Sequence, residues 1–202
     1  MTENTARPTV EFFFDFMSPT SYLAHTQLPQ IAERVGAGII WRPMLTLQLH
    51  ELTGNRSPTA VPNKAQWIFR DMLRFAGRYG VPLVINPNLP FEMKDALHGA
   101  FVALERGEIE RYCAELFPAV WADKVDVDDR VALADCIAAA DLDAEAILAR
   151  IDEPEIAAAL DANTREAAER GAFGAPTFFV GDEMHFGQDR LDFVEAALTR
   201  RD

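Results

Sequence analysis

The sequence predicts an α/β protein in which a small sheet domain is interrupted by a large all-helical insertion. Three observations support this prediction. The chain opens with a β-α-β pattern, its middle is rich in helix-forming residues, and it closes with a β-β-α pattern. We therefore expect a sheet domain built from residues 1–48 and 172–202, and a helical insertion domain at residues 49–171.

The opening pattern contains two strands and a connecting helix. The segment TVEFFFD at 9–15 is aromatic and β-branched, which is typical of a buried strand. Pro19 suits the first turn of a helix with Ser18 as its N-cap, and apolar residues at helical spacing extend this helix over 20–35. The segment at 38–44 is the second strand. The crossover is long enough for these two strands to be parallel.

The middle of the chain predicts helices. Residues 63–79 and 91–171 are rich in Ala, Leu, Glu and Arg, and Gly and Pro residues divide them into five or six helices. The short apolar run at 83–85 is the one possible strand in this region. A sheet that is interrupted for so long must be completed by strands nearer the C-terminus.

The closing pattern supplies those strands. Apolar runs at 177–180 and 184–186 flank Gly-Asp-Glu, which is a hairpin signal. An amphipathic helix follows from about residue 189 to 199, with its apolar residues on one face. The chain therefore ends β-β-α.

Charge is distributed unevenly along the chain. The 202 residues carry a net charge of −13, which argues against binding to nucleic acid or to an anionic membrane surface. Residues 105–169 hold 18 acidic and 6 basic residues, whereas residues 42–94 hold 7 basic and 3 acidic residues. A segment with a net charge of +4 is thus available to meet an anionic ligand.

Cysteine content and hydropathy limit the class of protein. The two cysteines, Cys113 and Cys136, form no CxxC motif, and we expect both to be buried in helices. The four histidines show no metal-ligand spacing, so no metal site is expected. The N-terminal stretch lacks the features of a signal peptide, and no apolar run approaches the ~20 residues of a membrane span. We expect a soluble, cytoplasmic protein.

Ser18 is the first candidate for chemistry. It lies where the first strand passes into a helix, at the carboxyl end of a parallel strand, where open α/β sheets bind ligands. Free N–H groups and the helix dipole would favour an anion such as a thiolate, and the serine hydroxyl could donate to it. On local evidence alone, a simple N-cap explains Ser18 better, because serine is a favoured cap in all helices.

The second candidate is Pro176, just before the returning strand. Local evidence favours a trans peptide bond, since only about 5–6% of X-Pro bonds in folded proteins are cis. Its position after a helical block and before a β-β-α unit points instead to a cis bond.

The element order, together with specific motifs, resembles a known family. FFFDFMSPTSYLA at 12–24, TGNRSP at 53–58, GVPLV at 80–84, the long motif GAFGAPTFFVGDEMHFGQDRLDFVEAAL at 171–198 and Trp121 resemble the 2-hydroxychromene-2-carboxylate isomerases. These enzymes belong to the DsbA-like, kappa-class glutathione transferase group. The resemblance implies a thioredoxin fold with a large helical insertion, glutathione as cofactor and a homodimer.

The resemblance also implies roles for the two candidates. Ser18 would orient or activate the glutathione thiol. Ala175, before the cis-Pro176, would pair through its backbone with the cysteinyl part of glutathione, as an added strand does. Without a CxxC motif, disulfide exchange is not expected, because a mixed disulfide needs a second thiol for its resolution.

Four further residues match positions that hold the ends of glutathione. Asn55 and Lys64 match those for the glycine end, and Gln188 and Asp189 match those for the γ-glutamyl group. Two of the four have a simpler alternative. Lys64 could be a solvated charge, and Asp189 could be the N-cap of the final helix.

The reaction implied by the resemblance interconverts 2-hydroxychromene-2-carboxylate and trans-o-hydroxybenzylidenepyruvate, or a related small aromatic carboxylate. A thiol would add to the conjugated substrate, bond rotation would follow, and the thiol would then leave. Two alternatives stay open: a kappa-class transferase or peroxidase that consumes glutathione, and a thiol-less thioredoxin-like binding or chaperone module.

Overall fold

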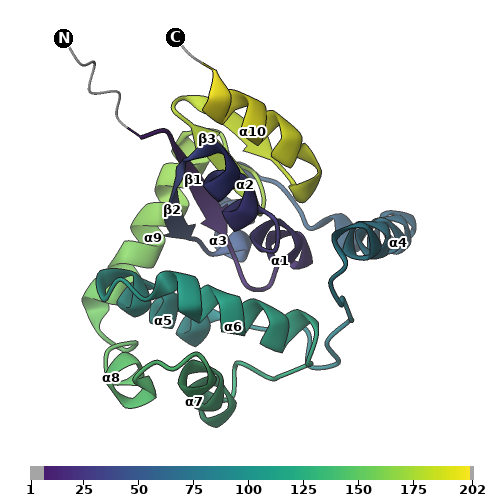
Figure 1. Cartoon of the computed structure of the whole chain (residues 1–202). Coiled ribbons are helices and arrows are strands. Elements are labelled where there is room, and N and C mark those ends of the chain that lie inside the picture. Colours follow the sequence, from purple (N-terminus) through teal and green to yellow (C-terminus); the bar gives the residue numbers. More distant parts are fainter. Residues whose placement is uncertain (1–6, 201–202) are drawn as a thin grey trace, which may run out of the picture.

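A four-stranded mixed sheet forms the centre of the computed structural model, which describes residues 7–200 (Figure 1). The strand order is β2-β1-β3-β4, with β1 at Thr9–Phe14, β2 at Gly38–Pro43, β3 at Thr177–Val180 and β4 at Glu183–Phe186. Strand β1 pairs in parallel with β2 and antiparallel with β3, and β3 and β4 form an antiparallel hairpin. The β-α-β opening and the closing hairpin are therefore confirmed.

The aromatic residues of β1 build a core on each face of the sheet. Phe12 stacks on Phe178 of β3 with ring centroids 5.3 Å apart, and both are fully buried. On the opposite face, Phe13 meets Phe179 with centroids 5.6 Å apart. Because side chains alternate along a strand, one run of phenylalanines supplies both cores.

The predicted helix over residues 20–35 is wrong in one respect, because the structure contains two helices there. Helix α1 spans Pro19–His25 and α2 spans Leu28–Val35. Pro29 lies in the first turn of α2, where its missing N–H costs nothing. In a continuous helix the same proline ring would clash with the carbonyl of His25, so the chain breaks between them.

The helical region between β2 and β3 contains short and long helices. They are α3 (Thr46–Thr53), η1 (Pro58–Ala60), α4 (Pro62–Tyr79), α5 (Lys94–Glu105), α6 (Ile109–Trp121), α7 (Arg130–Ala139), α8 (Ala144–Leu148) and α9 (Pro154–Glu169). The six helices from α4 to α9 agree with the prediction. The proposed domain boundary at residue 49 falls inside α3 and stays a prediction.

The possible strand at residues 83–85 is wrong. This segment is a loop whose Val84 N–H donates to the carbonyl of Trp121 at 2.8 Å. The buried Asn86 side chain fixes the loop further by donating to the carbonyls of Val120 and Val125 at 3.0 and 2.8 Å. The backbone is therefore satisfied by the end of α6 and the loop that follows it, and it joins no sheet.

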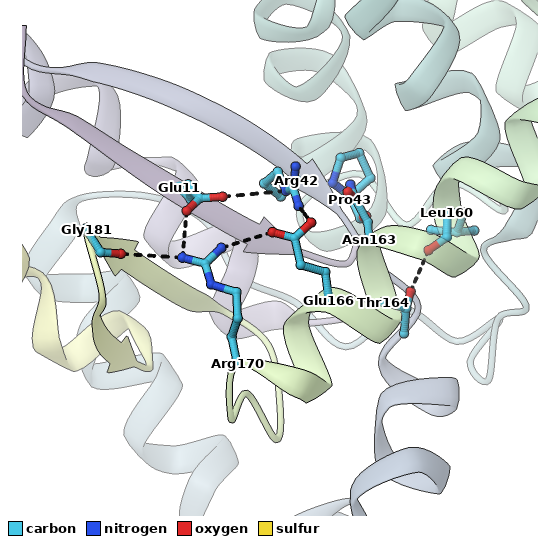
Figure 2. Close-up of polar contacts among 9 residues, drawn as sticks. All are labelled: Glu11, Arg42, Pro43, Leu160, Asn163, Thr164, Glu166, Arg170 and Gly181. Atoms are coloured by element: carbon cyan, nitrogen blue, oxygen red, sulfur yellow. Dashed lines mark hydrogen bonds and ion pairs between the residues drawn. The ribbon is translucent and has the colours of Figure 1, made fainter.

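Helix α9 is fastened to the sheet by a network of ion pairs (Figure 2). Arg170 lies between Glu11 of β1, at 2.7 Å, and Glu166 of α9, at 3.2 Å. Arg42 of β2 also pairs with Glu11 and Glu166. The guanidinium of Arg170 lies 3.8 Å from the ring centroid of Phe179, so the network is anchored on the aromatic core.

The final helix, α10, spans Leu191–Thr199 and follows a short 3-10 turn, η2, at Gln188–Arg190. It starts two residues later than predicted. No helix within residues 7–200 is both long and apolar enough to cross a membrane. The prediction about a signal peptide falls partly on residues 1–6, which lie outside the described residues.

Candidate active site

The backbone before Ser18 is held by a buried carboxylate. Asp15, at the end of β1, accepts from the N–H of Met17 at 2.9 Å and from the N–H of Thr46 at 2.8 Å, and its own carbonyl accepts from Ser18 N–H at 3.0 Å. Burial raises the pKa of Asp15, while these hydrogen bonds act in the opposite direction. Asp15 thus ties the turn that carries Ser18 to the start of α3.

Two aromatic side chains hold the same region from the helical side. Trp121 at the end of α6 donates its indole N–H to the carbonyl of Phe16 at 2.7 Å. The Tyr22 hydroxyl on α1 donates to the carbonyl of Pro82 at 2.9 Å. Both contacts are long-range, so the turn before α1 is positioned by the helical region as well as by the sheet.

Ser18 caps α1 and also meets the loop before β3. Its hydroxyl oxygen accepts from Ser21 N–H at 3.1 Å, so the N-cap interpretation is confirmed. The same oxygen lies 3.1 Å from the carbonyl oxygen of Ala175 and 2.9 Å from the hydroxyl of Thr20. Capping therefore leaves the serine proton available for other partners.

The Ala175–Pro176 peptide bond is cis, as predicted from its position. The carbonyl of Pro176 accepts from Gly187 N–H at 3.0 Å, and the Thr177 hydroxyl donates to the carbonyl of Gly174 at 2.8 Å. Within the described part of the chain, Ala175 N–H donates no hydrogen bond. This group is half-buried and free to pair with an extended ligand.

Gly174 is needed because of close packing. A Cβ atom at this position would lie 2.9 Å from the ring of Phe186. Phe186 and Phe173 form a tilted pair with centroids 4.5 Å apart, and both are about two-fifths exposed. An aromatic surface thus borders the loop that contains Ala175.

Asn55 lies beside this loop, whereas Lys64 lies on α4. The Asn55 amide donates to the carbonyl of Phe173 at 2.6 Å. Lys64 is exposed in the first turn of α4 and lines a shallow depression with Trp67 and Ile68. It forms no ion pair within residues 7–200, so its charge is available to a ligand.

Gln188 and Asp189 line a pocket of about 230 Å³ between the end of α4 and the start of α10. The Tyr79 hydroxyl donates to the carbonyl of Gln188 at 3.2 Å, which joins η2 to α4. The complete lining consists of Phe75, Arg78, Tyr79, Gln188, Asp189, Leu191 and Asp192. One guanidinium and two carboxylates therefore line one small pocket.

The alternative that Asp189 caps the final helix is wrong. The N-cap of α10 is Arg190, and no side-chain cap is formed there. The Asp189 carboxylate instead pairs with the Arg190 guanidinium at 2.6 Å. The residue lies in η2, one position too early to cap a helix that begins at Leu191.

Two further residues of the site, Thr20 and Arg78, were not predicted from the sequence. Thr20 donates to the carbonyl of Ala175 at 3.0 Å, and Arg78 lines the pocket beside Asp189. A hydroxyl two residues after Ser18 was visible in the sequence, but its partner lies 155 positions away. Arg78 belongs to the basic segment, and its place on α4 follows only from the packing of that helix.

The two cysteines lie in helices α6 and α7. Cys113 and Cys136 are both buried, as predicted, and burial raises the pKa of each thiol, that of Cys136 to about 11. The described residues contain no group of three or more side chains that could hold a metal ion.

The sequence matches a family model whose fold is the one described above. The DSBA-like thioredoxin domain model matches residues 9–199. The 2-hydroxychromene-2-carboxylate isomerase of Sphingobium xenophagum is 33% identical over 192 residues, which cover 94% of this chain and 97% of that protein. Glutathione S-transferase kappa 1 of Rattus norvegicus is 26% identical over 206 residues, which cover 95% and 91%.

A solved structure gives the same result. The structure of a 2-hydroxychromene-2-carboxylate isomerase superimposes with a TM-score of 0.86 at 30% identity and covers 94% of each chain. The fold is a DsbA-like thioredoxin fold in which helices are inserted between β2 and β3. The chain therefore belongs to the DSBA-like thioredoxin family, within the group that contains the 2-hydroxychromene-2-carboxylate isomerases.

Proposed function

We propose that this protein is a glutathione-dependent isomerase of a small aromatic carboxylate, with 2-hydroxychromene-2-carboxylate or a close relative as substrate. The observation that carries the proposal is the contact between the Ser18 hydroxyl and the Ala175 carbonyl of the cis-proline loop, beside an Ala175 N–H that donates to no group within residues 7–200. The names of the relatives at 31–33% identity support the same reaction.

The residues present fit glutathione, an anionic tripeptide with one ammonium and two carboxylates. Ala175 offers an N–H and a carbonyl for the cysteinyl backbone. Asp189 and Arg78 offer opposite charges in one pocket, which suits the ammonium and carboxylate of the γ-glutamyl end. Lys64 offers an exposed cation for the glycine carboxylate, and Asn55 offers its amide beside the cis-proline loop.

Ser18 performs the central task in this proposal. When bound, glutathione supplies a thiol that can add reversibly to a conjugated substrate. The Ser18 hydroxyl donates a hydrogen bond to the sulfur and thereby favours its ionised form. A hydrogen bond to a charged acceptor is roughly twice as strong as one between neutral groups. The Ser18 hydroxyl should therefore donate to the thiolate in preference to a neutral oxygen.

Ser18 does not act as a nucleophile in this proposal. A serine hydroxyl attacks only when a neighbouring base takes its proton. Among the described residues, Ser18 forms hydrogen bonds with Thr20, Ala175 and Ser21, none of which is a base. The serine therefore assists an external thiol. We further propose a cytoplasmic location and a homodimer, which the group resemblance supports.

A kappa-class transferase is the second candidate, supported by relatives at 22–26% identity. Product analysis separates the two functions. An isomerase returns glutathione unchanged after each turnover, whereas a transferase accumulates a glutathione adduct. Mass spectrometry of a reaction with excess substrate and limiting glutathione distinguishes these outcomes.

The decisive experiment follows isomerisation of 2-hydroxychromene-2-carboxylate by absorbance. We expect turnover only with added glutathione, and we expect Ser18→Ala to lower kcat about 10²-fold or more. Ser18→Thr retains both the cap and the hydroxyl and should keep part of the activity. Ser21→Ala removes a buried hydroxyl that has no hydrogen-bond partner within residues 7–200, and it serves as the matched control. Full turnover without glutathione would refute the proposal.

A further inference from the structure

We propose that Thr20 is a positioning residue, which donates to the Ala175 carbonyl and so leaves the Ser18 proton for the thiol sulfur. This inference rests on the proposed function. It begins from a triangle of three oxygens: the Ser18 hydroxyl, the Thr20 hydroxyl and the Ala175 carbonyl. The three separations are 2.9, 3.0 and 3.1 Å, all within hydrogen-bond distance.

The triangle has more contacts than protons. Each hydroxyl carries one proton, and the carbonyl carries none. Only two of the three contacts can therefore be hydrogen bonds at one time. The Ser18 hydroxyl can donate to a ligand only if the Ala175 carbonyl does not depend on it for a hydrogen bond.

Thr20 can satisfy the carbonyl alone. When Thr20 donates to the Ala175 carbonyl, the Ser18 hydroxyl donates to the neutral Thr20 oxygen. The Ser18 hydroxyl can then turn and donate to an anionic ligand, and the carbonyl keeps its hydrogen bond from Thr20. Removal of the Thr20 hydroxyl leaves Ser18 as the one hydroxyl of the triangle. The carbonyl then takes the Ser18 proton, because an uncovered, half-buried carbonyl is costly.

The carbonyl itself has room for a ligand only if the two hydroxyls do not both donate to it. It has two lone pairs, and an extended ligand paired with Ala175 needs one of them. With Thr20 on the first lone pair, the second remains for a ligand N–H. The neighbouring Ala175 N–H, which donates nothing within residues 7–200, completes this pairing edge.

Thr20 is well placed for this task and has no other polar partner. Its hydroxyl is within hydrogen-bond distance of Ser18 and Ala175 alone in the described residues. The fixed backbone dihedral of Pro19 and the Ser18 cap determine the direction of this first helical turn. Threonine is also a weaker helix former than alanine, so the hydroxyl is not explained by helix stability.

The test compares Thr20→Val, Thr20→Ser and the control Ser21→Ala with wild-type protein. Valine keeps the shape of threonine without its hydroxyl, and serine restores the hydroxyl. The ultraviolet absorbance of the thiolate, measured against pH, gives the pKa of the thiol in bound glutathione. Calorimetric titration with glutathione gives the affinity at a pH where the thiol is neutral and at a pH where it is ionised.

We expect Thr20→Val to raise the pKa of the bound thiol by about 0.5 to 1 and to lower kcat about three- to tenfold. Affinity for the neutral thiol form should change less than about twofold, because only the ionised form uses the Ser18 proton. Thr20→Ser should restore the thiol pKa, and Ser21→Ala should leave it unchanged.

Three other results would separate a failure of the Thr20 inference from a failure of the proposed function. If wild-type protein binds glutathione and lowers the pKa of its thiol, but Thr20→Val does the same, the inference about Thr20 is wrong and the proposed function stands. If Thr20→Val weakens binding equally at both pH values, Thr20 has only a structural role. If wild-type protein does not bind glutathione, the proposed function fails, and the inference fails with it.

Discussion

The Ser18 corner and helix α4 carry different parts of the proposed site, and they are built differently. The corner, residues 15–21 with the loop at 173–176, is mostly buried, and hydrogen bonds join it to α3 and α6. Helix α4 lies at the edge of the molecule in Figure 1, and Met72 and Ala76 are its only buried residues. The buried corner therefore holds the Ser18 hydroxyl in a fixed position, whereas α4 presents its basic side chains to solvent.

This difference has a physical reason. A hydroxyl that serves a reacting atom must be held within a fraction of an ångström, and only packing and satisfied hydrogen bonds achieve that. A lysine that attracts a carboxylate needs only its charge and reach. Substitutions that remove a hydrogen bond of the corner should therefore alter stability as well as activity, whereas the loss of a cation from α4 should alter affinity alone.

The largest effect is expected at Asp15. Asp15→Ala leaves the N–H groups of Met17 and Thr46 without their acceptor, which should lower the free energy of unfolding by about 2–4 kcal/mol. The matched control on α4 is Asp71→Ala, whose exposed partner is Arg74, with an expected change below about 0.5 kcal/mol. Urea unfolding measures both. Equal losses would contradict the contrast between the corner and α4.

Arg170, just before the cis-proline loop, should have the next largest effect. Arg170→Met removes two ion pairs and the contact with Phe179, and it leaves Glu11 half-buried with a more distant partner in Arg42. We expect a loss of about 2 kcal/mol. Arg165→Met removes one exposed pair on the same helix and should cost less than about 0.5 kcal/mol. If both variants lose the same free energy of unfolding, the ion-pair network around Arg170 stabilises the fold no more than one exposed ion pair does.

A pH dependence of stability is expected from the end of helix α1, just after the corner. His25 of α1 packs between Trp41 and Phe117, and burial lowers its pKa from 6.5 to about 4. The unfolded chain then binds a proton between these values more readily than the folded protein, so stability falls as the pH falls from 6.5 toward 4. We expect a loss of about 1–2 kcal/mol between pH 7 and pH 5 from this residue.

Unfolding measured at pH 5 and pH 7 for wild type, His25→Gln and Lys64→Met tests this assignment. The loss on acidification should be smaller in His25→Gln by about 1–2 kcal/mol. Lys64→Met lies on α4 and should keep the wild-type dependence. An unchanged dependence in His25→Gln would assign the acid sensitivity to other groups.

Lys64 should show the smallest effect, and it should be one of affinity alone. Lys64→Met removes an exposed cation, so we expect glutathione affinity to fall about five- to tenfold, or ~1 kcal/mol, while the free energy of unfolding stays within about 0.5 kcal/mol of wild type. Arg74→Met removes another cation from α4 and should leave affinity within about twofold. Calorimetric titration measures the glutathione affinity of both variants. Equal losses of affinity would mean that the overall positive charge of α4, and not Lys64 in particular, attracts the ligand.

Much of the fold could be predicted because strong local patterns coincide with the tertiary structure. The phenylalanines of β1 and the turn between β3 and β4 are unambiguous in sequence, and the order of elements follows from them. One error has a local cause, since Pro29 divides the helix predicted over 20–35, and the other arose where a long-range contact decides the outcome. The apolar run at 83–85 is a loop because Val84 pairs with the end of α6.

The candidate site divides in the same way. Ser18 and Pro176 carry local signals, a cap and a proline before a strand, and the resemblance to a family made them specific. Thr20 carries no such signal, since its hydroxyl acquires meaning only from a carbonyl in another part of the chain. Asp189 was open to a wrong local alternative because η2, not visible in the sequence pattern, delays the start of α10.

The strand order has a consequence for biosynthesis. Strand β1 emerges first from the ribosome, but its partner β3 is encoded more than 160 residues later. Until then one edge of a phenylalanine-rich strand stays unpaired, and such an edge invites association with other chains. The helices inserted between β2 and β3 must therefore fold while the sheet is incomplete. A nascent chain that stalls before residue 177 would keep the exposed edge, which makes it a natural target for chaperones.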